Sequence, residues 1–248
     1  MKLLIGIPSY QPGGVGTVAL LQALNRKKSF GYKDETGSLL TWNHNRLLAL
    51  ALNMKAAEGL THLLIMHSDV EPQTPDWLDI LENEMGKSEA DVLSAVIPIK
   101  DGFGVTSTAI DIGPDIWAPV RLTLRQVSTL PPTFTADKLL LNTGLMLIDL
   151  RRPWVECGAC FTIDDQLRQN EQGQWVAKVA SEDWNFSRAA ALCGARLYAT
   201  SAVQLIHHGS ARFSSREIWG DENDPLCKNQ NREHLFMAPD GTMQALKL

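Results

Sequence analysis

Short apolar runs alternate with helical segments along the first hundred residues, and this alternation limits the fold more than any other feature. Apolar runs at 3–7, 61–66 and 91–99 predict strands that are covered on both faces. Helical spacing lies between them, at 39–57 and from 74 onward. The order strand, helix, strand, helix, strand predicts an α/β fold with a mostly parallel central sheet and helices on both faces.

Residues with known end preferences support these boundaries. Gly59 ends the first long helix, since glycine tolerates the left-handed conformation that follows a helix. Thr74 can cap the next helix, and Pro75 suits its first turn. A later helix is expected at 181–193, with Ser181 as N-cap.

The second half of the chain predicts shorter elements. An alternating pattern at 120–127 predicts a half-exposed strand, and the polar stretch 168–174 predicts a turn. The segment from 209 onward is polar and lacks clear periodicity. The segments 139–141 and 145–150 lie on either side of Asn142-Thr143-Gly144, and short strands are expected at 195–200 and 202–206.

Composition is that of an ordinary globular enzyme of 248 residues with a net charge of −5. A net negative charge disfavours general electrostatic binding to nucleic acid. No apolar segment reaches the length of a membrane span, and the start of the chain does not read as a signal peptide. These features predict a cytoplasmic protein.

Four cysteines occur, and two of them are three residues apart. Cys157 and Cys160 have the spacing of a redox motif or half of a zinc site, with Cys193 and Cys227 further along. A structural zinc site needs a second close pair, which the sequence lacks. We therefore expect reduced thiols in or near a loop.

A polar triplet, His67-Ser68-Asp69, follows the apolar run 61–66. His67 and Asp69 point the same way because side chains in a strand alternate with a period of two. Ligands of open α/β sheets bind at the carboxyl ends of strands. A carboxylate beside an imidazole can hold a divalent metal, and a metal there can hold a diphosphate.

Six motifs, taken in order, resemble the GT-A fold glycosyltransferases of the family 2 type. They are the first strand running into Pro8-Ser9-Tyr10, the pair Asn45-Arg46, the triplet His67-Ser68-Asp69, the segment Asn142-Thr143-Gly144, the helix start Ser181-Glu182-Asp183-Trp184, and the late pair His207-His208. The resemblance covers residues 3 to 210. It implies one GT-A domain over 1–210 and a C-terminal tail over 211–248 that packs on or covers the active site.

The resemblance implies a nucleotide-sugar donor, with a UDP-sugar expected. Pro8, Ser9 and Tyr10 would line the base pocket, and the Tyr10 ring could stack on a uracil-like base. Arg46 could meet a phosphate bidentately, although an ion pair on the helix surface is equally open. Ser68 belongs to the triplet that would approach the diphosphate.

The resemblance also implies a divalent metal, Mn²⁺ or Mg²⁺, on Asp69 and either His207 or His208. The chain departs from the family at His67, where the first acid of the Asp-x-Asp motif is expected. An imidazole suits manganese better than magnesium, which prefers oxygen ligands. Two roles therefore stay open for His67, a metal ligand or a contact to substrate.

The helix start supplies the candidate catalytic group. An inverting transfer needs a carboxylate that takes the proton of the acceptor hydroxyl, and Asp183 would be this base. Four residues would bind the acceptor: Asn142, Gly144, Glu182 and Trp184. The acceptor would be a glycan, a lipid-linked sugar or, disfavoured by the acidic balance, a modified nucleic acid.

Two other functions remain open. A sugar-1-phosphate nucleotidyltransferase would need a basic residue in the glycine-rich loop after the first strand, and residues 9–16 contain neither Lys nor Arg. A nucleotide-sugar-binding protein without transferase activity would tolerate the missing first acid at His67.

Overall fold

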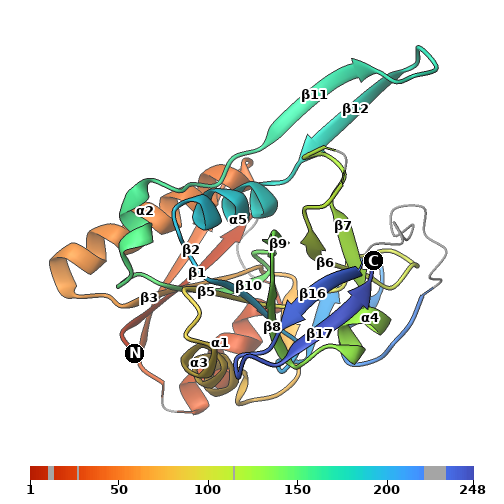
Figure 1. Cartoon of the computed structure of the whole chain (residues 1–248). Coiled ribbons are helices and arrows are strands. Elements are labelled where there is room, and N and C mark those ends of the chain that lie inside the picture. Colours follow the sequence, from red (N-terminus) through yellow and green to blue (C-terminus); the bar gives the residue numbers. More distant parts are fainter. Residues whose placement is uncertain (11–13, 27, 114, 221–232) are drawn as a thin grey trace.

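The computed structural model describes residues 1–10, 14–26, 28–113, 115–220 and 233–248. A large twisted sheet runs through the molecule, with helices packed against it (Figure 1). In order across this sheet the strands are β17 (Met243–Lys247), β16 (Glu233–Met237), β8 (Thr133–Ala136), β13 (Leu197–Thr200), β5 (Val92–Ala95), β10 (Leu145–Asp149), β3 (His62–Met66), β1 (Leu3–Ser9) and β2 (Phe30–Thr36).

The sheet is mixed, which corrects the prediction of a mostly parallel one. β1 pairs in parallel with both β2 and β3, and β13 pairs in parallel with β5. β10 enters between β3 and β5 and is antiparallel to both. An apolar run predicts a buried strand but carries no information on strand direction, so the sequence could not reveal this inversion.

Two hydrophobic clusters fill the space on the sheet, and alternate residues of β3 belong to different clusters. Leu64 and Met66 pack with α1 (Gly16–Asn25) and α3 (Trp77–Ser88). Leu63 and Ile65 pack with buried residues of α2 (Leu40–Glu58) and α5 (Glu182–Leu192). Since successive strand residues face opposite sides, the two helix pairs cover opposite faces of the sheet (Figure 1).

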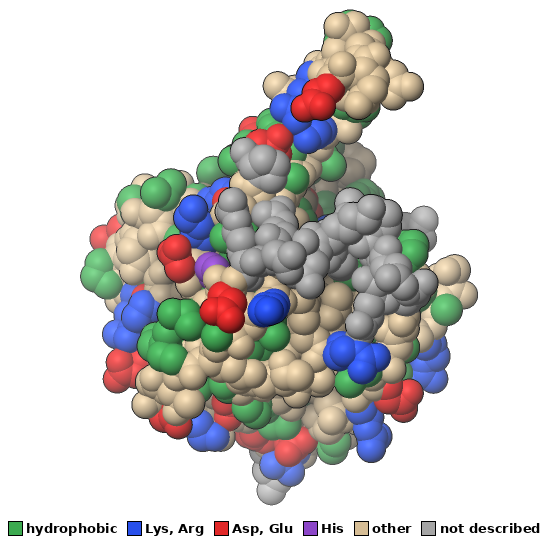
Figure 2. Space-filling view, turned by 45° about the vertical axis from the view of Figure 1, so that its right-hand side comes forward, with side chains coloured by type: hydrophobic (Ala, Val, Ile, Leu, Met, Phe, Trp, Pro, Cys, Tyr) green, Lys and Arg blue, Asp and Glu red, His purple; other side chains and the backbone are tan. Residues whose placement is uncertain are grey.

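Smaller sheets flank the main one. One orders β15 (Arg212–Ser214), β14 (Leu205–His208) and β4 (Val70–Pro72), and another orders β7 (Val120–Thr123), β6 (Val105–Ile110) and β9 (Leu139–Leu140). A hairpin of β11 (Asp164–Gln169) and β12 (Trp175–Ala180) projects from the body (Figures 1 and 2). The predicted turn at 168–174 therefore lies at the tip of this hairpin.

The segment 120–127 is a strand only in its first half. β7 ends at Thr123, and α4 (Leu124–Thr129) begins there. The Thr123 hydroxyl accepts from the Gln126 amide, and the Gln126 side chain accepts from the Thr123 amide. This capping box starts a helix in a segment whose alternation predicted a strand.

The described residues of the predicted tail include three strands. β15 joins β14, while β16 and β17 extend the main sheet beyond β8. Phe236 of β16 is fully buried against Phe134, with ring centroids 5.7 Å apart. Whether the tail also covers the functional site stays a prediction. No described helix is long and apolar enough to cross a membrane.

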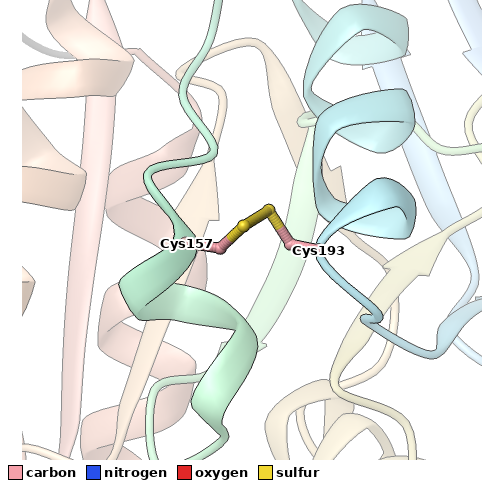
Figure 3. Close-up of a disulfide and its surroundings, with 2 residues drawn as sticks. All are labelled: Cys157 and Cys193. Atoms are coloured by element: carbon pink, nitrogen blue, oxygen red, sulfur yellow. A yellow bond between two sulfur atoms is a disulfide. The ribbon is translucent and has the colours of Figure 1, made fainter.

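A disulfide joins Cys157 to Cys193, which corrects the expectation of reduced thiols (Figure 3). It connects the 3-10 helix η1 (Pro153–Cys157) to the end of α5, and Cys160 is free and exposed. Cys227 lies outside the described residues. The cytoplasmic location stays a prediction.

Candidate functional site

The polar residues that follow β3 lie close to the segment before β10 and to the start of α5. This place is where β3 ends and the neighbouring strand β10 begins. β10 runs antiparallel to β3, so its beginning lies beside the end of β3, with Leu145 opposite Met66. The His67 amide donates to the Gly144 carbonyl at 2.9 Å. The antiparallel strand thus brings the motif Asn142-Thr143-Gly144 to His67.

Asp69 lies between two basic side chains. The Lys100 ammonium donates to Asp69 Oδ2, and His207 Nε2 is 3.6 Å from the same oxygen. Burial alone would raise the pKa of Asp69, but His207 and Lys100 outweigh it and hold that pKa well below its usual range. Asp69 is therefore ionised throughout the physiological range of pH.

Asp69 and His207 are the candidate ligands for a divalent cation, although the Lys100 ammonium already bonds Asp69 Oδ2. His207 Nδ1 is 2.8 Å from the Pro98 carbonyl, which can only accept, so Nδ1 carries a proton and Nε2 is the ring nitrogen that faces Asp69. Metal-binding histidines are commonly held by this kind of bond. A metal at this site would bind the deprotonated Nε2. Asp69 Oδ1 is buried without a hydrogen-bond partner. Asp69 and His207 therefore offer oxygen and nitrogen ligands side by side.

The other two predicted metal ligands face elsewhere. His208 Nε2 is 2.6 Å from Glu71 Oε2, and the His67 ring points to Thr143. Among the described residues, no group of three or more His, Cys, Asp or Glu side chains is arranged to hold a metal ion. A cation bound at Asp69 and His207 would thus complete its coordination with substrate oxygens and water.

A partly buried series of polar side chains connects His67 to Asp183. Thr143 Oγ1 donates to Asp183 Oδ1 at 2.6 Å, so it accepts from His67 Nε2, which is 3.0 Å away. The same nitrogen is 3.3 Å from Nε2 of His44, a fully buried ring that stacks on His67 and Phe161. Burial lowers the pKa of His67 to about 4, so the imidazole is neutral near pH 7.

Asp183 lies in the first turn of α5 and has a strongly perturbed pKa. Burial, together with the neighbouring Glu182 carboxylate, raises the pKa of Asp183 to about 7. The hydrogen bonds from Thr143 and the charge of Arg121 act in the opposite direction. A carboxylate with a pKa near neutrality is suited to accept a proton from a hydroxyl group.

The predicted base-binding residues follow β1. Pro8 and Ser9 are buried in the strand, and the Ser9 hydroxyl donates to Asp34 at 3.2 Å. Tyr10 is 66% exposed. Arg46 forms an ion pair with Glu35, with Nε 3.1 Å from Oε1, so the structure shows the ion-pair alternative for this side chain. The carbonyl of Ser68 accepts from the first residue of α1, Gly16.

Of the four predicted acceptor-binding residues, three lie in the protein interior and one lies at the surface. Asn142 is buried, and its side chain bonds the Ala95 carbonyl and the Gly144 amide. Gly144 is packed so closely that a Cβ would lie 2.4 Å from Ile97. Trp184 is buried beneath the Arg121 guanidinium, 4.4 Å from its ring centroid. Glu182 is the member of this set that borders a surface pocket.

Sequence reasoning missed Lys100, His44 and the role of Thr143. Lys100 belongs to a glycine-rich loop without periodicity, and His44 is one polar residue within a helix, so no local signal marked either of them. Thr143 belongs to the motif Asn142-Thr143-Gly144, but its contacts to His67 and Asp183 depend on the direction of β10, which the sequence does not predict.

Comparison with known proteins gives a likeness of fold. No protein-family model matches the chain, and no curated protein matches it in sequence. Among solved structures, A197 from STIV is similar with a TM-score of 0.51 and 15% identity, over 100% of this chain and 95% of that one. At this identity the likeness extends to the fold alone.

Two weaker likenesses are to enzymes named for sugar nucleotides or sugar phosphates. UDP-glucose pyrophosphorylase, solved with UDP-glucose, has a TM-score of 0.39 and 9% identity over 84% of this chain and 93% of that one. Mannose-1-phosphate geranyltransferase from Thermus thermophilus has a TM-score of 0.37 and 11% identity, over 83% of this chain and 76% of that one. These scores are too low to support an argument about this chain.

Proposed function

We propose that this protein is a glycosyltransferase of the GT-A type. It would move a sugar from a nucleotide-sugar donor, with a UDP-sugar expected, to an acceptor hydroxyl, with inversion. The observation that carries the proposal is the chain from His67 through Thr143 to Asp183. These hydrogen bonds connect the loop that holds Asp69 to the carboxylate of Asp183, whose pKa suits a general base.

Asp183 would accept the proton of the acceptor hydroxyl as the oxygen attacks the anomeric carbon. Thr143 holds Oδ1 of this carboxylate, and the first turn of a helix favours a negative charge. The proton released by the acceptor is then on Asp183. The bond between the anomeric carbon and the diphosphate breaks, and the nucleoside diphosphate leaves with the bonding electrons.

Two positive charges near Asp69 would face the diphosphate of the nucleotide-sugar. Lys100 is a fixed cation at this carboxylate. A divalent metal held by Asp69 and His207, manganese in preference to magnesium, would neutralise charge on the leaving diphosphate. His208 bonds Glu71 instead, and we leave it out of this proposed ligand pair.

Donor binding is tested by calorimetry with UDP, with and without Mn²⁺. We expect tighter binding with the metal and loss of this gain in Asp69→Ala. Equal affinity in both conditions would remove the metal from the proposal and leave Lys100 as the cation. A wild-type protein that binds no UDP in either condition would overturn the proposed function.

The base is tested by Asp183→Asn in an assay of UDP release from a panel of UDP-sugars. Turnover is expected to fall by about a hundredfold to ten-thousandfold, the usual scale for a positioned base. UDP affinity is expected to stay unchanged because the base acts in the transition state. A folded variant with normal turnover would exclude Asp183 as the base.

A further inference from the structure

An open pocket of about 500 Å³ lies between the end of β1, the start of α2 and the base of the hairpin. Its lining includes three apolar side chains with large exposed areas: Leu39 is 68% exposed, Tyr10 66% and Trp42 60%. Ile163 adds a fourth, 45% exposed. Two aromatic rings exposed to water in one concave site are typical of ligand binding, since an isolated monomer gains nothing from this exposure.

The charged groups of this pocket are acidic. Asp165 and Glu182 line it, and no Lys or Arg does. A diphosphate or another anion would be repelled here. A neutral ligand rich in hydroxyl groups is suited to it, because its O–H groups can donate to both carboxylates.

Aromatic rings and carboxylates together match the two kinds of surface that a sugar ring presents. The C–H groups on one face of a pyranose are apolar and pack on an aromatic ring, while its hydroxyls point outward from the edge. Tyr10 and Trp42 supply rings, and Asp165 and Glu182 supply acceptors.

The pocket and the candidate base share the first turn of α5. Glu182 lines the pocket, and the next residue in the same helical turn is Asp183. We propose that this pocket, referred to below as the aromatic pocket, binds a neutral oligosaccharide acceptor through stacking on Trp42 and Tyr10 and hydrogen bonds to Asp165 and Glu182. This proposal rests on the proposed function and adds the chemical class of the acceptor.

The aromatic pocket gives Tyr10 a different role from the stacking on a nucleotide base expected from the sequence. A uracil-like ring could stack on Tyr10, but the diphosphate attached to it would have to lie away from Asp165 and Glu182. The two roles make opposite predictions for UDP binding by the Trp42 and Tyr10 variants.

The test is binding of the intact chain to an array of neutral oligosaccharides, followed by calorimetry with the best-bound compound. Trp42→Ala should weaken this binding by roughly tenfold, the scale of one aromatic contact. Asp165→Asn should weaken it by a smaller factor. Trp175→Ala is the matched control, because Trp175 is similarly exposed, at 66% against 60% for Trp42, but lies on the hairpin outside the pocket.

The results separate this proposal from the proposed function. Loss of oligosaccharide binding in Trp42→Ala with unchanged UDP affinity supports the acceptor pocket. No binding to any neutral oligosaccharide, or binding that Trp42→Ala leaves intact, overturns it. So does tighter binding of a cationic oligosaccharide such as chitosan, or a loss of UDP affinity in Trp42→Ala and Tyr10→Ala. Failure of wild-type protein to bind UDP overturns the proposed function instead.

Discussion

At the scale of single residues, the raised pKa of Asp183 links its proposed role as a base to the stability of the fold. Its pKa of about 7 in the folded protein is above the ordinary value of 3.8, so the folded state holds the proton more tightly than the unfolded chain. The contribution of this group to stability is complete below about pH 4 and is lost as the pH rises through about 7.

Asp183→Asn should therefore flatten the dependence of stability on pH. Asn cannot ionise, so the melting temperature of the variant relative to wild type is expected to rise between about pH 4 and pH 8. Thermal unfolding of both proteins across this range measures the difference. A constant difference would mean that Asp183 does not titrate in this window in the folded protein.

Thr143 is expected to position and tune Asp183. Its hydroxyl donates to Asp183 Oδ1, which favours the ionised form and lowers its pKa. Thr143→Val keeps the shape but removes the donor, so the acidic limb of the pH–rate profile should move to higher pH. Thr143→Ser restores the hydroxyl and should restore the profile. Matching profiles for the Val variant and wild type would show that this hydrogen bond does not tune the base.

At the scale of elements, the disulfide joins the two ends of the segment that contains the candidate base. Cys157 and Cys193 are 36 residues apart, and the loop that they close contains the hairpin and α5 with Asp183. Closing a loop of this length typically stabilises a protein by about 2–4 kcal/mol.

Reduction should therefore lower the melting temperature. The double variant Cys157→Ser/Cys193→Ser should melt at the temperature of the reduced protein and show no further response to reductant. Cys160→Ser is the control, since Cys160 is free and exposed and its replacement should leave the melting curve unchanged. A wild-type melting temperature that is insensitive to reductant would show that the bond contributes nothing to stability.

The elements that the sequence predicted are those whose burial sets the local pattern. β1, β3, α2 and α5 were found because their apolar spacing and end residues agree. β2 was missed because most of its seven residues are exposed or partly exposed at the edge of the sheet. The hairpin was missed for the same reason, since its strands face solvent over most of their length.

The same logic applies to the site. Asp69, Glu182 and Asp183 follow from motifs at the ends of predictable elements. His207 lies beside Asp69 because β14 pairs with β4. Lys100 reaches Asp69 from a loop in another part of the chain. These contacts join residues far apart in sequence, and local patterns do not encode them.

At the scale of the whole molecule, charge is spread over the surface. Figure 2 shows acidic and basic side chains interspersed on one face, without a large patch of a single sign there. With a net charge of −5, this distribution gives no support to nucleic acid as a general partner. Specificity for an acceptor would then depend on local chemistry such as that of the aromatic pocket.

The last strands place the two ends of the chain in one sheet. β16 pairs with β8, which pairs with β13, so residues 233–248 extend the sheet that also holds β3 and β1. Phe236 is fully buried against Phe134, while its neighbour Leu235 is 55% exposed. The described end of the predicted tail is thus part of the core and cannot open without losing buried apolar area.

Phe236→Ala should destabilise the whole protein, by about 3–5 kcal/mol, because it leaves a cavity in the main core. Leu235→Ala, one residue away on the same strand, should cost far less because that side chain is already half in water. Denaturant unfolding, followed both by intrinsic tryptophan fluorescence and by circular dichroism, measures the two costs. If the sheet is one unit, both probes shift together in Phe236→Ala. A variant that unfolds at the wild-type denaturant concentration, or whose two probes separate, would show that β16 and β17 form an independent flap.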